Sequence, residues 1–168
     1  SPSQKKHLRS YLALLYWQKG EREEAVSILE TLLSEDGHYR TTHVYSTLGY
    51  FLLHSGNRER ALALNIEAVD YDSTPDIQDN LAASYIAMED WENAEIICNK
   101  VIETNPSFSE AWYHAGLIAE HSGDYETADS HYKRSLRSIF STLSLLKKEA
   151  VIEKIQEMRI QLDKQNLL

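Results

Sequence analysis

Histidine is the residue type in this chain that most invites a metal-binding or acid–base role. The sequence holds seven of them: His7, His38, His43, His54, His114, His121 and His131. His114 and His121 would lie two turns apart on one helix, which is too far for the pair to chelate one metal ion. No histidine pair stands at metalloprotease spacing beside a carboxylate. We therefore predict no metal site and no catalytic histidine, although His7 and His43 are candidates to titrate near neutral pH.

The other reactive side chains give no clearer signal of catalysis. Cys98 is the only cysteine in the sequence, which excludes an intrachain disulfide and a cysteine-based metal site, and we expect it to be a buried apolar side chain. The carboxylate pairs Asp76/Asp79 and Glu89/Asp90 fall at expected helix starts or turns, where acidic groups stabilise the helix dipole. Glycine-rich phosphate loops are absent. We predict a protein that is not an enzyme and that has no catalytic residue and no cofactor.

Charge and hydropathy narrow the classes of partner. The net charge is −9, and residues 41–140 carry six basic and sixteen acidic side chains. This excess argues against nucleic acid and anionic membranes as ligands, although acidic surfaces also aid solubility. No apolar run approaches the roughly 20 residues that span a bilayer, so we expect no direct membrane insertion. We expect a cytoplasmic location, and a chain without an initiator Met suggests a fragment of a larger or membrane-anchored protein.

The elements that position these residues follow a repeat. Four alanines are spaced 36, 33 and 34 residues apart within the same local pattern, namely Ala25, Ala61, Ala94 and Ala128. A near-constant period of this length is typical of one supersecondary unit that is copied and stacked.

The last copy shows the pattern most clearly. Trp112 and Gly116 recur at helical spacing, Gly123 breaks that helix, and Ala128 and Tyr132 lie on one face of a second helix. The pattern predicts a helical hairpin in which the small residues allow close approach and the large ones fill the remaining space. Matching residues in the other copies are Leu12, Ala13, Tyr16, Gly20, Leu29, Leu32, Tyr45, Leu48, Gly49, Leu52, Gly56, Asn65, Ala68, Leu81, Ala82, Tyr85, Trp91, Cys98, Val101 and Pro106.

These residues resemble the tetratricopeptide repeat (TPR) family over four repeats, with departures at Arg9, Gln78 and Asn65. The resemblance implies an all-α, right-handed superhelical solenoid of helix-turn-helix repeats at about 6–41, 42–74, 75–108 and 109–141, in a single domain 1–168. A C-terminal helix at about 142–166 would follow, with the apolar stripe Val151, Ile155, Met158 and Leu162. We favour a capping role for this helix over dimerisation, which the off-stripe Ile152 and Ile160 would serve.

The resemblance also implies a concave groove lined by the first helix of each repeat. The residues at the second, fifth, ninth and twelfth positions of each repeat are predicted to bind peptide. They are His7, Ser10, Leu14, Trp17, His43, Ser46, Tyr50, Leu53, Asp76, Asp79, Ala83, Ile86, Glu110, Tyr113, Leu117 and Glu120.

This lining is aromatic and apolar in the first half and acidic in the second. Trp17, Tyr50 and Tyr113 are the expected apolar anchors, and the carboxylates are expected to favour basic residues. The lining has no Lys, Arg or Asn, so we do not expect the clamp with which some TPR proteins hold acidic chaperone tails. We predict a monomeric or homodimeric scaffold, adaptor or chaperone-like module that binds a peptide with apolar anchors and basic residues. The alternatives are a self-assembly module that uses the array edge or the last helix, and a regulatory TPR domain of a larger protein.

Overall fold

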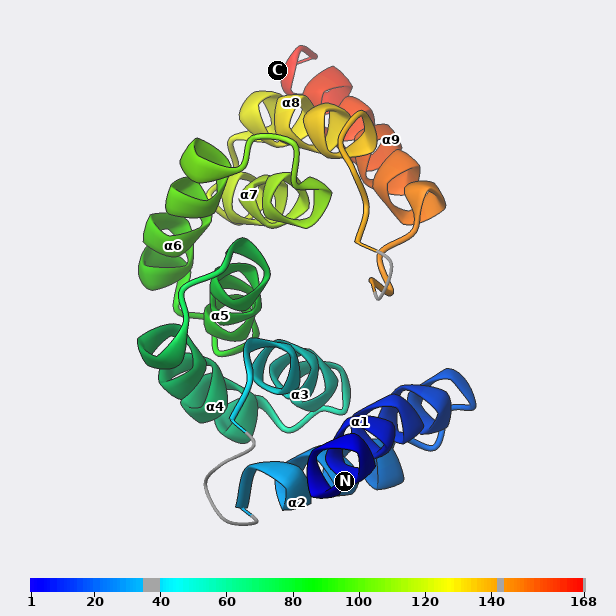
Figure 1. The fold of residues 1–168 in the computed structure, drawn as a ribbon. Coiled ribbons are helices and arrows are strands. Elements are labelled where there is room, and N and C mark those ends of the chain that lie inside the picture. The colour runs from blue at the N-terminus through cyan, green and yellow to red at the C-terminus, as the bar shows by residue number, and fades with distance from the viewer. Residues whose placement is uncertain (35–39, 142–143, 168) are drawn as a thin grey trace. The chain divides into compact units, whose positions relative to one another are not determined.

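A computed structural model describes residues 1–34, 40–141 and 144–167. Their regular structure is helical apart from one isolated β-bridge, which confirms the all-α prediction (Figure 1). The helices are α1 (Pro2–Gln18), α2 (Arg22–Ser34), α3 (Thr42–His54), α4 (Arg58–Tyr71), α5 (Pro75–Ala87), α6 (Trp91–Thr104), α7 (Ser109–His121), α8 (Tyr125–Leu136) and α9 (Lys148–Gln165). The chain divides into two compact units, Ser1–Met88 and Glu89–Leu168, which we describe separately.

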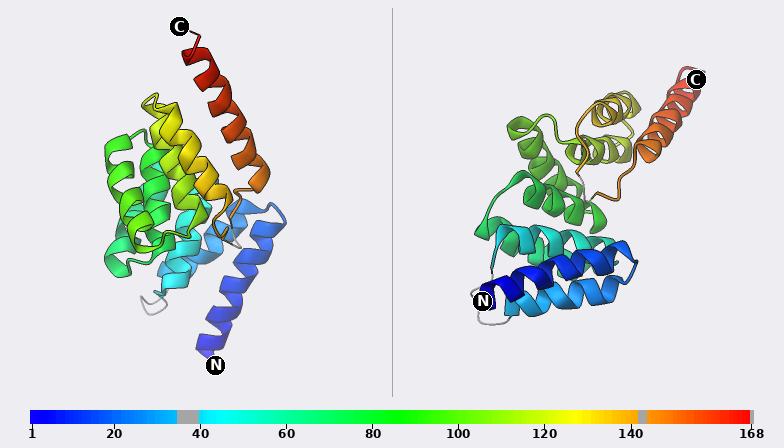
Figure 2. Two further views of the ribbon diagram at one scale, coloured as in Figure 1. Left: turned by 90° about the horizontal axis from the view of Figure 1, so that it is seen from above. Right: turned by 45° about the vertical axis from the view of Figure 1, so that its right-hand side comes forward.

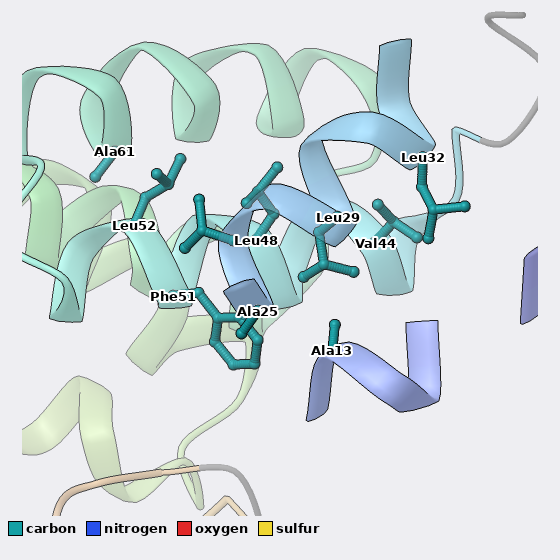
Figure 3. Packing of buried hydrophobic residues seen from close by; sticks show 10 residues of the cluster. Ala13, Ala25, Leu29, Leu32, Val44, Leu48, Phe51, Leu52 and Ala61 are labelled. Carbon is teal, nitrogen blue, oxygen red and sulfur yellow. The ribbon is translucent and has the colours of Figure 1, made fainter. Parts of the chain in front are cut away.

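The first unit contains helices α1 to α5, and its core joins neighbouring hairpins. Leu29 and Leu32 of α2 pack with Val44 and Leu48 of α3 in one buried cluster (Figure 3). Each of these side chains is almost completely removed from water. The second helix of one hairpin therefore covers the first helix of the next, and the apolar area buried between them stabilises the stack.

The hairpin turns repeat a left-handed residue with the period of the alanines. Gly20, Gly56 and Gly123 have φ of 84°, 81° and 79°, a region that glycine enters without steric cost. The third turn has Glu89 at this position, with φ of 61°. Because a Cβ atom makes this conformation costly, Glu89 is the residue at which we locate backbone strain.

Within a hairpin, a glycine of the first helix makes room for a side chain of the second. A Cβ atom added at Gly116 would clash with the ring of Tyr132, and one added at Gly49 would clash with the side chain of Asn65. Both pairs are 16 residues apart and occupy the same position in their repeats. Gly116 therefore allows the close approach that we predicted, and the group that approaches its backbone is the Tyr132 ring.

Asn65 begins a buried polar network in the first unit. Its Nδ2 donates to Ser84 Oγ at 2.9 Å, and that hydroxyl donates to the carbonyl oxygen of Asn80 at 2.8 Å. Asn80 Nδ2 in turn donates to the carbonyl oxygen of Ser46 at 2.8 Å. The network bonds α4, α5 and α3 together at the place where other repeats are apolar, and buried polar groups need such partners.

The second unit consists of α6, the hairpin α7–α8, and α9. Helix α9 lies beside α8 (Figures 1 and 2), and its Val151, Ile155 and Met158 form one buried cluster with Ala128 and Tyr132. Three of the four predicted stripe residues therefore face the hairpin, whereas Leu162 is half-buried, and the helix begins only at Lys148. Ile152 and Ile160 are exposed, and residues 142–143 of the predicted segment lie outside the described residues.

The segment that follows α8 returns to the start of α7. Ser109 N donates to the carbonyl oxygen of Ile139 at 3.1 Å, and Ile139 N donates to that of Ser107 at 2.9 Å. These bonds form the parallel bridge between Phe108 and Ile139. Inside the hairpin, Ser109 Oγ also donates to the carbonyl oxygen of Ser135 at 2.9 Å.

Candidate functional site

Four predicted groove residues form a surface in the first unit that we call the apolar ledge, consisting of Leu14 and Trp17 of α1 and Tyr50 and Leu53 of α3. All four are half-buried and pack against the core cluster. The Trp17 ring stacks on Phe51 with 4.0 Å between ring centroids and an interplanar angle of 7°, and it lies 6.3 Å from the Tyr50 ring. The ledge is therefore held from beneath by the core while part of each side chain still meets solvent.

Two residues outside the predicted set complete the surroundings of the ledge. The guanidinium of Arg22 lies 5.1 Å from the centroid of the Trp17 ring, and its Nη1 donates to the carbonyl oxygen of His54 at 2.7 Å. The His54 ring lies 4.2 Å from that of Tyr50. Arg22 is in a second helix, which the TPR groove positions do not include. The repeat register therefore gives no signal for Arg22, and its contact with Trp17 is seen only in the fold.

The two serines among the predicted groove residues of α1 and α3 donate hydrogen bonds to backbone carbonyls of their own helices. Ser10 is buried and its Oγ donates to the carbonyl oxygen of His7 at 2.7 Å, while Ser46 Oγ donates to that of His43 at 3.3 Å. His7 and His43 are exposed, and the His7 ring meets Tyr11 edge-on at 4.9 Å.

Helix α5 places its predicted residues at different depths. Asp76 is exposed in the first turn and accepts a hydrogen bond from Thr74 Oγ1 at 2.7 Å. Asp79 and Ala83 are buried, and Ile86 is half-buried. Only Asp76 of this set therefore presents an exposed carboxylate in the first unit.

Two carboxylates predicted on α7 have structural partners in the second unit. Glu110 is buried, and its Oε1 accepts a hydrogen bond from Ser141 N at 3.0 Å, whereas its Oε2 has no partner among the described residues. Glu120 accepts from Tyr132 Oη at 2.6 Å and from Lys154 Nζ at 3.0 Å. The negative charge of Glu120 is therefore already matched by a lysine of α9.

Burial and this ion pair shift three pKa values around Glu120. Burial raises the pKa of Tyr132, and the hydrogen bond to Glu120 raises it further. Burial also raises the pKa of Tyr113, which with Leu117 packs against the cluster beneath α9. For Lys154, burial lowers the pKa, but bonds to Glu157 and Glu120 outweigh it and leave the pKa raised. The lysine is accordingly a permanent cation at neutral pH.

The other histidines pack against aromatic rings. His121 stacks on Trp91 at 3.9 Å between centroids, and His131 lies 5.4 Å from Trp112. Burial lowers the pKa of His131. Both line a cavity of about 260 Å³ that Cys98 also borders. His38 lies outside the described residues, and among those described no three His, Cys, Asp or Glu side chains are placed to hold a metal ion.

Within 1–34, 40–141 and 144–167, none of the helices combines the length and the apolar character that crossing a bilayer requires.

Solved TPR structures share this fold. A thermophilic TPR protein from Thermus thermophilus aligns with a TM-score of 0.77 at 16% identity, over 94% of this chain and 82% of that one. The Sgt2 TPR domain from Aspergillus fumigatus aligns with a TM-score of 0.62 at 18% identity, over 76% and 82%. The first TPR of Spaghetti (RPAP3), bound to the HSP90 peptide SRMEEVD, aligns with a TM-score of 0.60 at 20% identity, over 73% and 93%.

Sequence comparisons lead to the same class. The heat shock protein STI1 of Saccharomyces cerevisiae is 26% identical over 98 residues, which are 57% of this chain and 17% of that protein. The match therefore spans under a fifth of the yeast protein. The family model for the tetratricopeptide repeat protein 21 C-terminal ARM domain matches residues 1–143. The TPR assignment is confirmed, and the chain belongs to the family of tetratricopeptide repeat protein 21 C-terminal ARM domains.

Proposed function

We propose that this chain is a non-catalytic protein-interaction module that binds a peptide segment on its first helices, with the apolar ledge as the main contact. The observation that carries the proposal is the packing of Trp17 and Tyr50. Both rings are fixed by the core yet still half-exposed, so a ligand would bury more of their area at little cost in side-chain entropy. The membership of a TPR family and the TPR neighbours support a binding role.

The exposed charge among the predicted groove residues shapes the ligand that we propose. Asp76 is the exposed carboxylate among the four predicted selectors, since Asp79 and Glu110 are buried and Glu120 is paired with Lys154. We propose a peptide with apolar anchors for the ledge and a basic residue for Asp76. The guanidinium of Arg22, which lies beside Trp17, already donates to a backbone carbonyl, which leaves it less suited to hold a ligand carboxylate.

A pair of peptides tests the charge preference. The acidic peptide SRMEEVD, which is bound by the first TPR of Spaghetti, is compared with a charge-reversed SRMKKVK by isothermal titration calorimetry. We expect the charge-reversed peptide to bind more tightly, and Asp76→Asn to reduce the difference by about half. Tighter binding of SRMEEVD would contradict the proposed preference.

Ledge variants test the surface itself. Tyr50→Ala is expected to weaken binding of SRMKKVK by about tenfold, because an anchoring ring is removed. The matched control is Ile96→Ala, which removes an exposed apolar side chain of α6 in the second unit. Equal loss of binding in both variants, or none in Tyr50→Ala, would place the binding site away from the ledge.

A second candidate function is self-assembly through α9. Ile152 and Ile160 are 41% and 54% exposed on that helix, which favours an apolar contact with another copy. Truncation before α9 would uncover Tyr132, so substitution is the cleaner test. If α9 drives assembly, analytical ultracentrifugation will show a dimer that Ile152→Lys with Ile160→Lys converts to a monomer, whereas a wild-type monomer excludes this function.

A further inference from the structure

Helix α1 carries an apolar stripe that no other part of the described chain covers. Leu8, Tyr11, Leu12 and Leu15 recur at helical spacing and are 67%, 54%, 42% and 55% exposed. Four large apolar side chains gathered on one helix face are unusual for a surface that meets only water. We call these four residues the α1 stripe. It is distinct from the apolar ledge.

The repeat register shows what such a face does elsewhere in the first unit. A shift by 36 residues aligns the α1 stripe with Val44, Thr47, Leu48 and Phe51 of α3, and a further 33 residues align it with Ile77, Asn80, Leu81 and Ser84 of α5. These eight side chains are buried, and the most exposed of them, Asn80, reaches 7%. The equivalent positions in the two following repeats are therefore buried, whereas those of the α1 stripe are exposed.

In each of those repeats a preceding second helix does the covering. Leu29 and Leu32 of α2 lie in the cluster with Val44, Leu48 and Phe51 (Figure 3). Helix α4 covers α5 in the same way, with Ala68 packed near Ile77. Helix α1 has no such helix before it among the described residues.

From this continuity we infer that the α1 stripe docks an amphipathic helix of the α2 type from outside residues 1–168, with Ala at one position and Leu four and seven residues later. The pattern is that of Ala25, Leu29 and Leu32 in α2. This helix takes the place on α1 that α2 takes on α3, and burial of the stripe drives the association.

The chemistry of the stripe selects this type of helix over the α4 type. Helix α4 has Asn65 at the place of Leu29, and that amide donates to Ser84 Oγ. The residue of α1 that aligns with Ser84 is Leu15, which accepts no hydrogen bond through its side chain. An asparagine docked there would be buried without a partner, at a cost in binding free energy.

Charge adds to the fit. Between Pro2 and Gln18, helix α1 carries Lys5, Lys6 and Arg9 and no acidic residue. Helix α2 carries Glu23, Glu24 and Glu30 against a single basic residue, Arg22. An incoming acidic helix of this kind therefore meets a basic one, which raises the rate of association and disfavours basic helices.

The test uses a peptide with the sequence of α2, Arg22–Ser34, added in trans to the complete chain. A hydrocarbon staple between the solvent-facing positions 23 and 27 holds it helical, because a free peptide of this length is marginally helical in water. Fluorescence anisotropy of the labelled peptide is expected to show saturable binding. An analogue with Leu29→Asn is expected to bind about tenfold more weakly.

Variants of the chain complete the test. Leu8→Asp and Leu15→Asp are expected to weaken binding by about tenfold or more, and since both side chains are exposed the fold is retained, which circular dichroism verifies. Ile96→Asp, at an exposed position of α6, is the matched control and is expected to bind like wild type.

Any of three results of the binding experiment would overturn the inference: no binding of the stapled peptide, equal binding by Leu8→Asp, or equal binding of the asparagine analogue. A wild-type dimer that Leu8→Asp dissociates would assign the stripe to a second copy, and it would equally overturn the docking proposed here. None of these outcomes bears on Tyr50 or Asp76, so the proposed function is tested independently.

Discussion

The ring of Tyr132 in α8 lies on the backbone of Gly116 in α7, where an added Cβ atom would be 2.6 Å from Cδ1 of the ring. The ring is completely buried and its hydroxyl donates to Glu120 of α7. One tyrosine thus fixes the separation of the two helices and also bonds them together.

Gly116→Ala is expected to destabilise the protein. The new methyl group must displace the Tyr132 ring, and overpacking of this kind outweighs the gain in helix propensity, leaving a net loss of about 1–2 kcal/mol in the free energy of unfolding. Urea denaturation measures it. The same substitution in a Tyr132→Leu background serves as control and is expected to be neutral or stabilising. A more stable Gly116→Ala single variant would contradict the packing described.

Glu89→Gly is expected to stabilise the third turn. Glycine removes the steric cost of φ at 61°, and its larger backbone entropy in the unfolded chain offsets part of the gain, so we expect about 0.5–1 kcal/mol. Thermal denaturation followed by circular dichroism measures the change. Glu95→Gly, within α6, is the matched control and is expected to lose about 1 kcal/mol. A destabilised Glu89→Gly would show that the turn carries no strain.

The bond between Asn65 and Ser84 is expected to couple α4 to α5 energetically. We expect Asn65→Ala to cost about 2 kcal/mol and Ser84→Ala about 1 kcal/mol, because each removes a buried hydrogen bond. A double-mutant cycle in urea is expected to give a coupling of about 1 kcal/mol. Asn99→Ala, on the exposed side of α6, is expected to change stability by less than about 0.5 kcal/mol. Additive effects at Asn65 and Ser84 would contradict a direct bond.

Alkaline pH is expected to destabilise the first unit through Tyr45. Burial and the hydrogen bond that its hydroxyl donates to Glu67 raise the pKa of Tyr45 from 10.0 to about 12. The native chain therefore keeps this proton above pH 10 while the unfolded chain loses it. The resulting stability is complete below pH 10 and is lost as the pH rises towards 12.

Urea denaturation between pH 9 and about 12 checks this dependence. Tyr45→Phe is expected to make the fall of unfolding free energy with pH less steep, because one hydroxyl with a raised pKa is gone while those of Tyr113 and Tyr132 remain. Tyr11→Phe provides the control for the loss of one tyrosine from the optical signal. An unchanged slope in Tyr45→Phe would contradict the raised pKa.

The helices and their turns could be predicted because they depend on short-range chemistry. Gly20, Gly56 and Gly123 mark breaks that only local backbone geometry requires, and the spacing of Ala25 and Ala128 marks the inner faces of second helices. Sequence reasoning placed Glu89 in a turn for the same reason. Its left-handed φ has no signature in the sequence and is seen only in the structure.

The candidate site was less accessible to sequence reasoning, because departures from the repeat decide it. The repeat register predicts that Glu110 lines an exposed groove. In the structure, the segment after α8 returns to the start of α7, and Ser141 N donates a hydrogen bond to the Glu110 carboxylate. Glu120 was expected to select ligands, yet its charge is matched by Lys154, which is 34 residues away in a helix outside the repeat pattern. Long-range contacts of this kind have no signature in a 34-residue period.

The backbone bridge between Phe108 and Ile139 gives the fourth hairpin a main-chain connection between its two ends. Repeats of this class hold together through neighbours, so their ends fray first. Here the two ends of a single hairpin are bonded to each other, and Ser109 adds a further bond to Ser135. These bonds join the first and last residues of the hairpin, so we expect α7 and α8 to unfold locally as one cooperative unit. Their amide hydrogens should then exchange together rather than progressively from one end.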